Sequence, residues 1–75
     1  MYARTPRKDE KTRRFTISEA GVSGWEVRDE HDDGLVTRVV YSDWHRVERA
    51  RSAFVATAKA LMSAGWSEPD AVVDL

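Results

Sequence analysis

Hydrophobic and polar residues alternate along three consecutive stretches in the first half of the chain. In residues 13–20, Phe15 and Ile17 alternate with hydroxyl side chains, which is typical of a strand with one buried face. The alternation resumes in residues 25–30, and residues 35–41 are rich in the β-branched side chains that strands favour. Turn-forming residues separate the three stretches, so the pattern predicts a three-stranded antiparallel sheet.

The second turn indicates the register of this sheet. Residues 32–34, Asp-Asp-Gly, suit a three-residue hairpin loop that ends with glycine in the left-handed region. A two- or four-residue loop would instead set Arg38 beside a core valine. The three-residue loop, with a first loop of the same length, predicts the pairs His31–Leu35, Val27–Val39, Trp25–Tyr41 and Ile17–Val27. This register keeps the large apolar side chains on one face, which we expect to face the core: Trp25, Val27, Leu35, Val39 and Tyr41.

The apolar period becomes helical after the third strand and persists to about residue 64. Ser42 or Asp43 can cap the first turn, because either side chain can accept a backbone N–H. Gly65 suits the left-handed residue that ends many helices, and such an end would bring Trp66 onto Leu61. The expected apolar face of the helix consists of Trp44, Val47, Phe54, Val55, Ala58, Leu61 and Met62.

These elements predict an α+β fold, in which one long C-terminal helix packs on one face of a three-stranded antiparallel meander. We expect this β-β-β-α domain to span residues 13–66. Residues 1–12 show no apolar period and carry mainly basic side chains, so we expect a disordered basic arm. Residues 67–75 are expected to form a short acidic tail with room for one helical turn.

Composition restricts the classes of protein to which the chain can belong. Its 75 residues suit one small domain, and its net charge of -1 argues against a uniformly basic nucleic-acid-binding surface. The absence of cysteine excludes disulfides and thiolate metal sites. No apolar run approaches the ~20 residues that span a bilayer. Residues 1–14 also lack the apolar segment of a secretory signal, so we expect a cytoplasmic protein that does not enter a membrane.

Candidate catalytic and metal-binding patterns do not survive a check of their spacing. Residues 29–34 resemble the start of a calcium-binding EF-hand loop, but Val40 occupies the position that requires a bidentate glutamate. The only two histidines, His31 and His45, are expected at opposite ends of the sheet. Ser42 could reach His45, but a helix cap explains that serine and nothing supplies an oxyanion hole. We therefore expect no enzyme, no metal and no cofactor.

Two surfaces of the predicted fold could bind a partner. The sheet face opposite the helix carries Arg14, Arg28 and Arg38, which could contact phosphate groups together with Arg46 and Arg49 of the helix. The same face carries Val36 and Val40, which are candidates for an apolar interface. A ridge of small residues on the far side of the helix could admit a second helix: Ala53, Ala56 and Ala60. The alternative interpretations are a solvated face neutralised by Glu26 and Glu30, and alanines that only favour helix.

The order of three strands and one long helix resembles that of the plant AP2-type and transposon-integrase N-terminal DNA-binding domains. Residues 24–28, Gly-Trp-Glu-Val-Arg, and the alanine-rich helix carry the resemblance, which covers about residues 14–65. It implies a sheet that lies in the major groove of DNA. The double-stranded-RNA-binding domain also ends in three strands and a helix, but its first helix and its lysine pair have no counterpart here.

Two functions follow as hypotheses. The first is a small non-catalytic interaction module that binds a protein partner or itself, through the open sheet face or the alanine ridge. The second is a nucleic-acid-binding module that uses the basic N-terminal arm and the arginines of the sheet face. The acidic residues around the second turn would repel a nucleic acid, so we rank this hypothesis second.

Overall fold

A computed structural model describes residues 1–68, 73 and 74 of the chain. Its secondary structure, in chain order, is β1 (Tyr2–Arg4), β2 (Arg7–Lys8), β3 (Lys11–Glu19), the 3-10 helix η1 (Gly21–Ser23), β4 (Trp25–His31), β5 (Val36–Tyr41), α1 (Trp44–Ser63) and β6 (Val73–Asp74).

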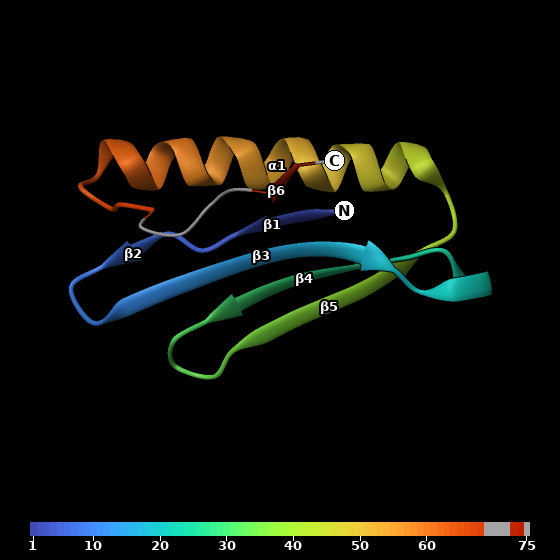
Figure 1. Ribbon diagram of the computed structural model, residues 1–75, viewed down its shortest axis with the longest axis horizontal. Coiled ribbons are helices and arrows are strands. Elements are labelled where there is room, and N and C mark those ends of the chain that lie inside the picture. Colours follow the sequence, from blue (N-terminus) through green and yellow to red (C-terminus); the bar gives the residue numbers. More distant parts are fainter. Residues whose placement is uncertain (69–72, 75) are drawn as a thin grey trace.

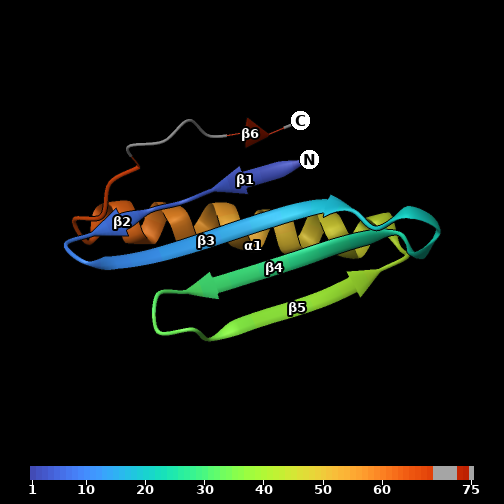
Figure 2. The same ribbon diagram turned by 60° about the horizontal axis from the view of Figure 1, so that its bottom comes forward.

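The strands form one antiparallel sheet with the order β5-β4-β3-β1-β6, and β2 pairs with the beginning of β3. Helix α1 runs along one face of this sheet, while β5 lies at the edge furthest from β1 and β6 (Figures 1 and 2). The predicted α+β class and the C-terminal helix are confirmed. The three expected strands are β3, β4 and β5, and the sheet extends beyond them through β1 and β6.

The predicted register is confirmed at each of its pairs. Val27 lies opposite Ile17 on one side and opposite Val39 on the other, and Trp25 lies opposite Tyr41. The hairpin loop is held by Asp33, whose Oδ1 accepts the backbone N–H of Leu35 at 3.0 Å. The loop therefore has the three-residue length that its sequence indicates.

Both ends of α1 are formed by the residues that the sequence suggests. Asp43 is the cap at the beginning, and its Oδ1 accepts the backbone N–H of His45 at 2.9 Å. At the other end, the N–H of Trp66 donates to the carbonyl of Leu61, and the N–H of Gly65, with φ at +96°, donates to that of Met62. These two bonds define a Schellman motif, which satisfies carbonyl groups that a helix end leaves open.

Three aromatic rings form the centre of the core. Phe54 of α1 stacks on Phe15 of β3 with ring centroids 4.8 Å apart, and on Tyr2 of β1 at 6.1 Å. The other buried core residues come from β3, β4 and α1: Ile17, Val27, Val47 and Ala58. The core therefore lies between α1 and the β1, β3 and β4 region of the sheet.

The expectation of a disordered arm over residues 1–12 is wrong. Tyr2 is only 2% exposed, and its strand pairs with β3 from Ile17 to Phe15. Pro6 is also buried, and β2 forms a short hairpin with the start of β3. Strands of two and three residues are too short to show an apolar period, which explains why the pattern did not predict them.

The C-terminal residues that the structure describes pair with this N-terminal segment. Ser67 forms a bridge with Arg7, and β6 pairs with β1. Glu68 accepts hydrogen bonds from the guanidinium of Arg4, which raises the pKa of Arg4 above its usual value. The helical turn predicted within residues 67–75 falls mainly on residues 69–72 and 75, which lie outside the described residues. Within the described part of the chain, no helix is long and apolar enough to cross a membrane.

Candidate interaction surface

Strand β5 is a hydrophobic strand that remains exposed on both of its faces. Val36, Val39 and Val40 are 44%, 38% and 38% exposed, and Leu35 just before the strand is 58% exposed. Tyr41, the last residue of β5, is its only member that packs against the described core. Leu35 and Val39 lie on the predicted face of the sheet, but the expectation that they join the core is wrong.

The width of the sheet explains why β5 is uncovered. Five neighbouring strands at about 4.8 Å spacing span roughly 19 Å between their outer axes. A single helix is only about 10 Å wide. Tyr2 of β1 stacks on Phe54 of α1, and α1 crosses behind β3 and β4 in Figure 2, while β5 extends beyond it except at its Tyr41 end, which packs against the core.

The free edge of β5 presents backbone groups at every second residue. The N–H of His31 donates to the carbonyl of Leu35 at 2.9 Å, which identifies this pair as hydrogen-bonded. Hydrogen-bonded and non-hydrogen-bonded pairs alternate along an antiparallel ladder, and the β4–β5 register is unbroken. The N–H and C=O groups of Val36, Arg38 and Val40 therefore point away from β4. No strand in the described part of the chain pairs with them.

This edge lacks the features that usually prevent edge strands from pairing. Proline, lysine and β-bulges are common at exposed edges, because each of them blocks or disfavours an added strand. Residues 36–41 contain neither proline nor lysine, and their pairing with β4 shows no bulge. The only charged residue in β5 is Arg38, whose Nε lies 2.9 Å from Glu26 Oε2. The edge is therefore open to pairing and almost neutral.

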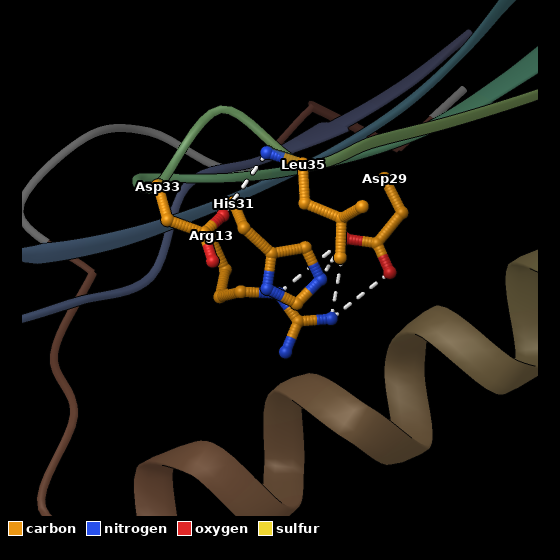
Figure 3. Close-up of polar contacts among 5 residues, drawn as sticks. All are labelled: Arg13, Asp29, His31, Asp33 and Leu35. Atoms are coloured by element: carbon orange, nitrogen blue, oxygen red, sulfur yellow. Dashed lines mark hydrogen bonds and ion pairs between the residues drawn. The ribbon is translucent and has the colours of Figure 1, made fainter.

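A polar cluster marks the hairpin end of β5 on the face that α1 covers (Figure 3). Arg13 Nη2 lies 2.9 Å from Asp29 Oδ2, and its guanidinium stacks over the ring of Phe15 at 5.1 Å. His31 Nε2 lies 3.7 Å from the same carboxylate. Leu35 lies beside these groups instead of in an apolar core (Figure 3). The two-residue strand period could have located this cluster, since all four residues share one face of the predicted register.

The arginines proposed as nucleic-acid contacts do not form one basic surface. Arg28 lies directly opposite Arg38 and is flanked by Glu26 and Glu30, at 3.7 and 3.6 Å. Arg14 is exposed and pairs across the ladder with Glu30. Because acidic groups alternate with these three arginines, the outer sheet face has little net positive charge.

The two helix arginines belong to a different surface. Arg46 and Arg49 line an open hollow with Tyr41 and Ala50, on the side of the sheet that carries α1. Strand alternation places Arg14, Arg28 and Arg38 on the opposite side. A phosphate backbone that follows the outer face would therefore not reach all five of the expected contacts.

The alanine ridge is exposed as the helical period predicts. Ala53, Ala56 and Ala60 are all exposed on α1. Two apolar residues expected in the core are exposed as well: Trp44 at 48% and Val55 at 38%. Trp44 instead packs its ring on Trp25 at 5.0 Å. The alanine ridge thus offers small residues, and none of its three alanines lines a hollow that the structure describes.

Comparison with protein-family models, with curated proteins and with solved structures finds no match to this chain. The resemblance to AP2-type domains therefore stays an expectation from the order of elements, and the sheet differs from that order by its additional β1 and β6 strands.

Proposed function

We propose that this protein is a small non-catalytic interaction module that binds a protein strand along the free edge of β5. The observation that supports the proposal is the exposure of β5, which combines apolar side chains on both faces with unpaired backbone groups at Val36, Arg38 and Val40. This location replaces the broader expectation of the open sheet face or the alanine ridge.

Strand addition explains how such an edge would bind. An extended segment that pairs with β5 satisfies the outward N–H and C=O groups, and main-chain hydrogen bonds of this kind supply affinity. The side chains that alternate along the strand supply specificity, here mainly the valines at positions 36, 39 and 40. Burial of their exposed apolar area adds the hydrophobic contribution, at about 25 cal/mol per Å².

Nucleic-acid binding remains the second hypothesis, with the exposed Arg14 as its best support. Acidic neighbours oppose this hypothesis, since Glu26 and Glu30 lie among the arginines of the outer face. A nucleic-acid site would weaken steeply with salt, because each neutralised phosphate releases a counterion.

A titration followed by amide NMR separates the two hypotheses. The protein probe is a peptide with the β5 sequence, Leu-Val-Thr-Arg-Val-Val-Tyr-Ser, and the control is the same composition in scrambled order. We expect the β5 peptide to shift the amide signals of Val36, Arg38 and Val40, and the scrambled peptide and a DNA or RNA duplex to leave them unchanged. If neither peptide moves these signals while a duplex moves those of Arg14 and Arg28, the interaction-module proposal is wrong.

A proline variant of the edge, Val40→Pro, provides the control on the protein. In Val40→Pro the lost N–H points to the free edge, so we expect the β4–β5 ladder to persist while peptide binding falls. The scrambled peptide should leave the amide signals of both proteins unchanged. Full peptide binding by Val40→Pro would show that the edge is not the docking site.

A further inference from the structure

We infer that the strand that docks on β5 belongs to a second copy of this chain, so that two copies join in an antiparallel two-fold pair centred on Val39. The inference rests on the proposed function, because it takes β5 as the docking strand and names its partner. Its support comes from the backbone pattern, the side-chain register and the distribution of charge at the two ends of β5.

The backbone pattern of β5 allows it to pair with itself. A two-fold axis perpendicular to the sheet sets two copies of β5 antiparallel, as closed dimers require an isologous contact. With the axis at Val39, the outward groups of Arg38 in each copy meet those of Val40 in the other, and the outward groups of Val36 face Ser42, just after β5. The two sheets become one continuous sheet with both α1 helices on the same face.

The charge on Arg38 argues against one register, and the apolar side chains of β5 favour another. Centring the axis on Arg38 would set two arginines directly opposite each other, which is destabilising. Centring it on Val39 sets Arg38 opposite Val40 of the second copy and brings the two Val39 side chains together. Glu26, 2.9 Å from Arg38, offsets this charge only in part, because Arg28 of the same chain shares the carboxylate at 3.7 Å.

The two ends of β5 carry complementary charges. The hairpin loop that precedes β5 has exposed Asp32 and Asp33, and the helix start that follows it has exposed Arg46 and Arg49 near Tyr41, which outnumber the one exposed carboxylate there, that of Asp43. Antiparallel pairing brings the acidic loop of each copy beside the basic helix start of the other. The two-fold symmetry forms this contact twice. If the two β5 strands were parallel, the acidic loops would lie together and the basic helix starts would lie together, which is unfavourable.

An introduced thiol tests the register directly, since the chain has no cysteine. In the inferred dimer the two copies of residue 39 form a non-hydrogen-bonded pair with Cα atoms about 4.5 Å apart, which is within the range of a disulfide. We expect Val39→Cys to form a linked dimer under mild oxidation. The control Val55→Cys alters a valine of the same 38% exposure on α1, away from the inferred contact, and should remain mainly without a disulfide link. Equal linkage in both variants, or none in a folded Val39→Cys variant, contradicts the register.

Exchanging two charges tests the contact between the acidic loop of one copy and the helix start of the other. This test needs no introduced cysteine. Asp32→Lys and Arg46→Glu should each raise the dimer dissociation constant about three- to tenfold, since an exposed ion pair contributes little and symmetry counts it twice. The double variant should return to within about twofold of the wild type, because the pair is restored with reversed sign. A double variant that is weaker than either single variant contradicts this contact.

Sedimentation equilibrium, run beside the peptide titration, separates the failure of this inference from that of the proposed function. We expect the wild-type chain to pass from monomer to dimer at micromolar to submillimolar concentration, as suits a small interface. A chain that stays monomeric throughout but binds the β5 peptide overturns the second-copy inference and leaves the proposed function standing. A monomeric chain whose β5 signals also ignore the peptide overturns both.

Discussion

The replacement of Gly24 by alanine tests how tightly the end of β5 is held against the start of β4. Gly24 has φ at +108° and ψ at -118°, a backbone conformation that residues with a Cβ rarely adopt. A Cβ placed there would overlap the carbonyl oxygen of Tyr41 and lie 2.9 Å from the Cα of Ser42. These are backbone atoms, so the end of β5 would have to move.

The expected loss in the free energy of unfolding of Gly24→Ala has two parts. A non-glycine residue in such a conformation costs about 1–3 kcal/mol. Displacement of packed backbone adds a similar amount, about 1–3 kcal/mol. Gly24→Ala should therefore lower the free energy of unfolding by about 2–6 kcal/mol, out of roughly 4–11 kcal/mol for a chain of this length.

Gly21→Ala is the matched control. Gly21 begins the short helix η1, which Gly24 caps at its other end, and its φ is +63°. Unlike Gly24, it has open space where its Cβ would lie. Its expected cost is the left-handed strain alone, about 1–2 kcal/mol. Urea unfolding followed by tryptophan fluorescence measures both values. Equal losses in the two variants would refute the close approach of Gly24 to the end of β5.

Three further predictions concern the N-terminal strand, the helix cap and the edge of β5. Tyr2→Ala should cost about 3–5 kcal/mol by thermal unfolding, as for a buried aromatic, whereas a disordered arm would give no change. Asp43→Ala should lose about 0.5–2 kcal/mol by urea unfolding, and an unchanged midpoint would exclude the capping bond to His45. Val39→Pro should unfold the β4–β5 hairpin while Val40→Pro leaves it folded, as seen by NMR of the strand amides; equal damage would contradict the alternation of hydrogen bonds along β5.

Local features of the sequence were sufficient to predict the hairpin and the helix. The Asp-Asp-Gly loop determines which residues pair, and Asp33 holds that loop through the N–H of Leu35. Asp43 and Gly65 mark the ends of α1 because their roles depend only on neighbouring residues. These interactions lie within a few residues of the chain, so their signals are visible in one sequence.

The parts of the fold that the sequence did not predict depend on contacts between distant residues. Tyr2 forms its strand only because Phe15 and Ile17 offer a free edge and Phe54 offers a ring to stack on. The exposure of Val39 follows from that strand, since β1 takes space under the helix. An alternating pattern shows which face a residue occupies, but it does not show how far a single helix covers that face.

The candidate surface was likewise predicted only in part. The predicted register placed Arg14, Arg28 and Arg38 on the outer face, in agreement with the strand pairs. It offered Glu26 and Glu30 as neutralising groups, but not the specific contacts of Glu26 with both Arg28 and Arg38, which depend on side-chain conformations across two strands. It also treated Val36 and Val40 as part of a face, whereas their backbone groups belong to a free edge.

Amide hydrogen exchange along β5 at two protein concentrations tests the central claim most directly. At low concentration we expect fast exchange at Val36, Arg38 and Val40, and slow exchange at Val39 and Tyr41, whose N–H groups bond to β4. At high concentration the first three amides should become protected, as a second strand covers the edge. Fast exchange of those three amides at every concentration would contradict the inferred pairing of β5 with a second copy, and uniform protection of all five amides at low concentration would contradict the free edge itself.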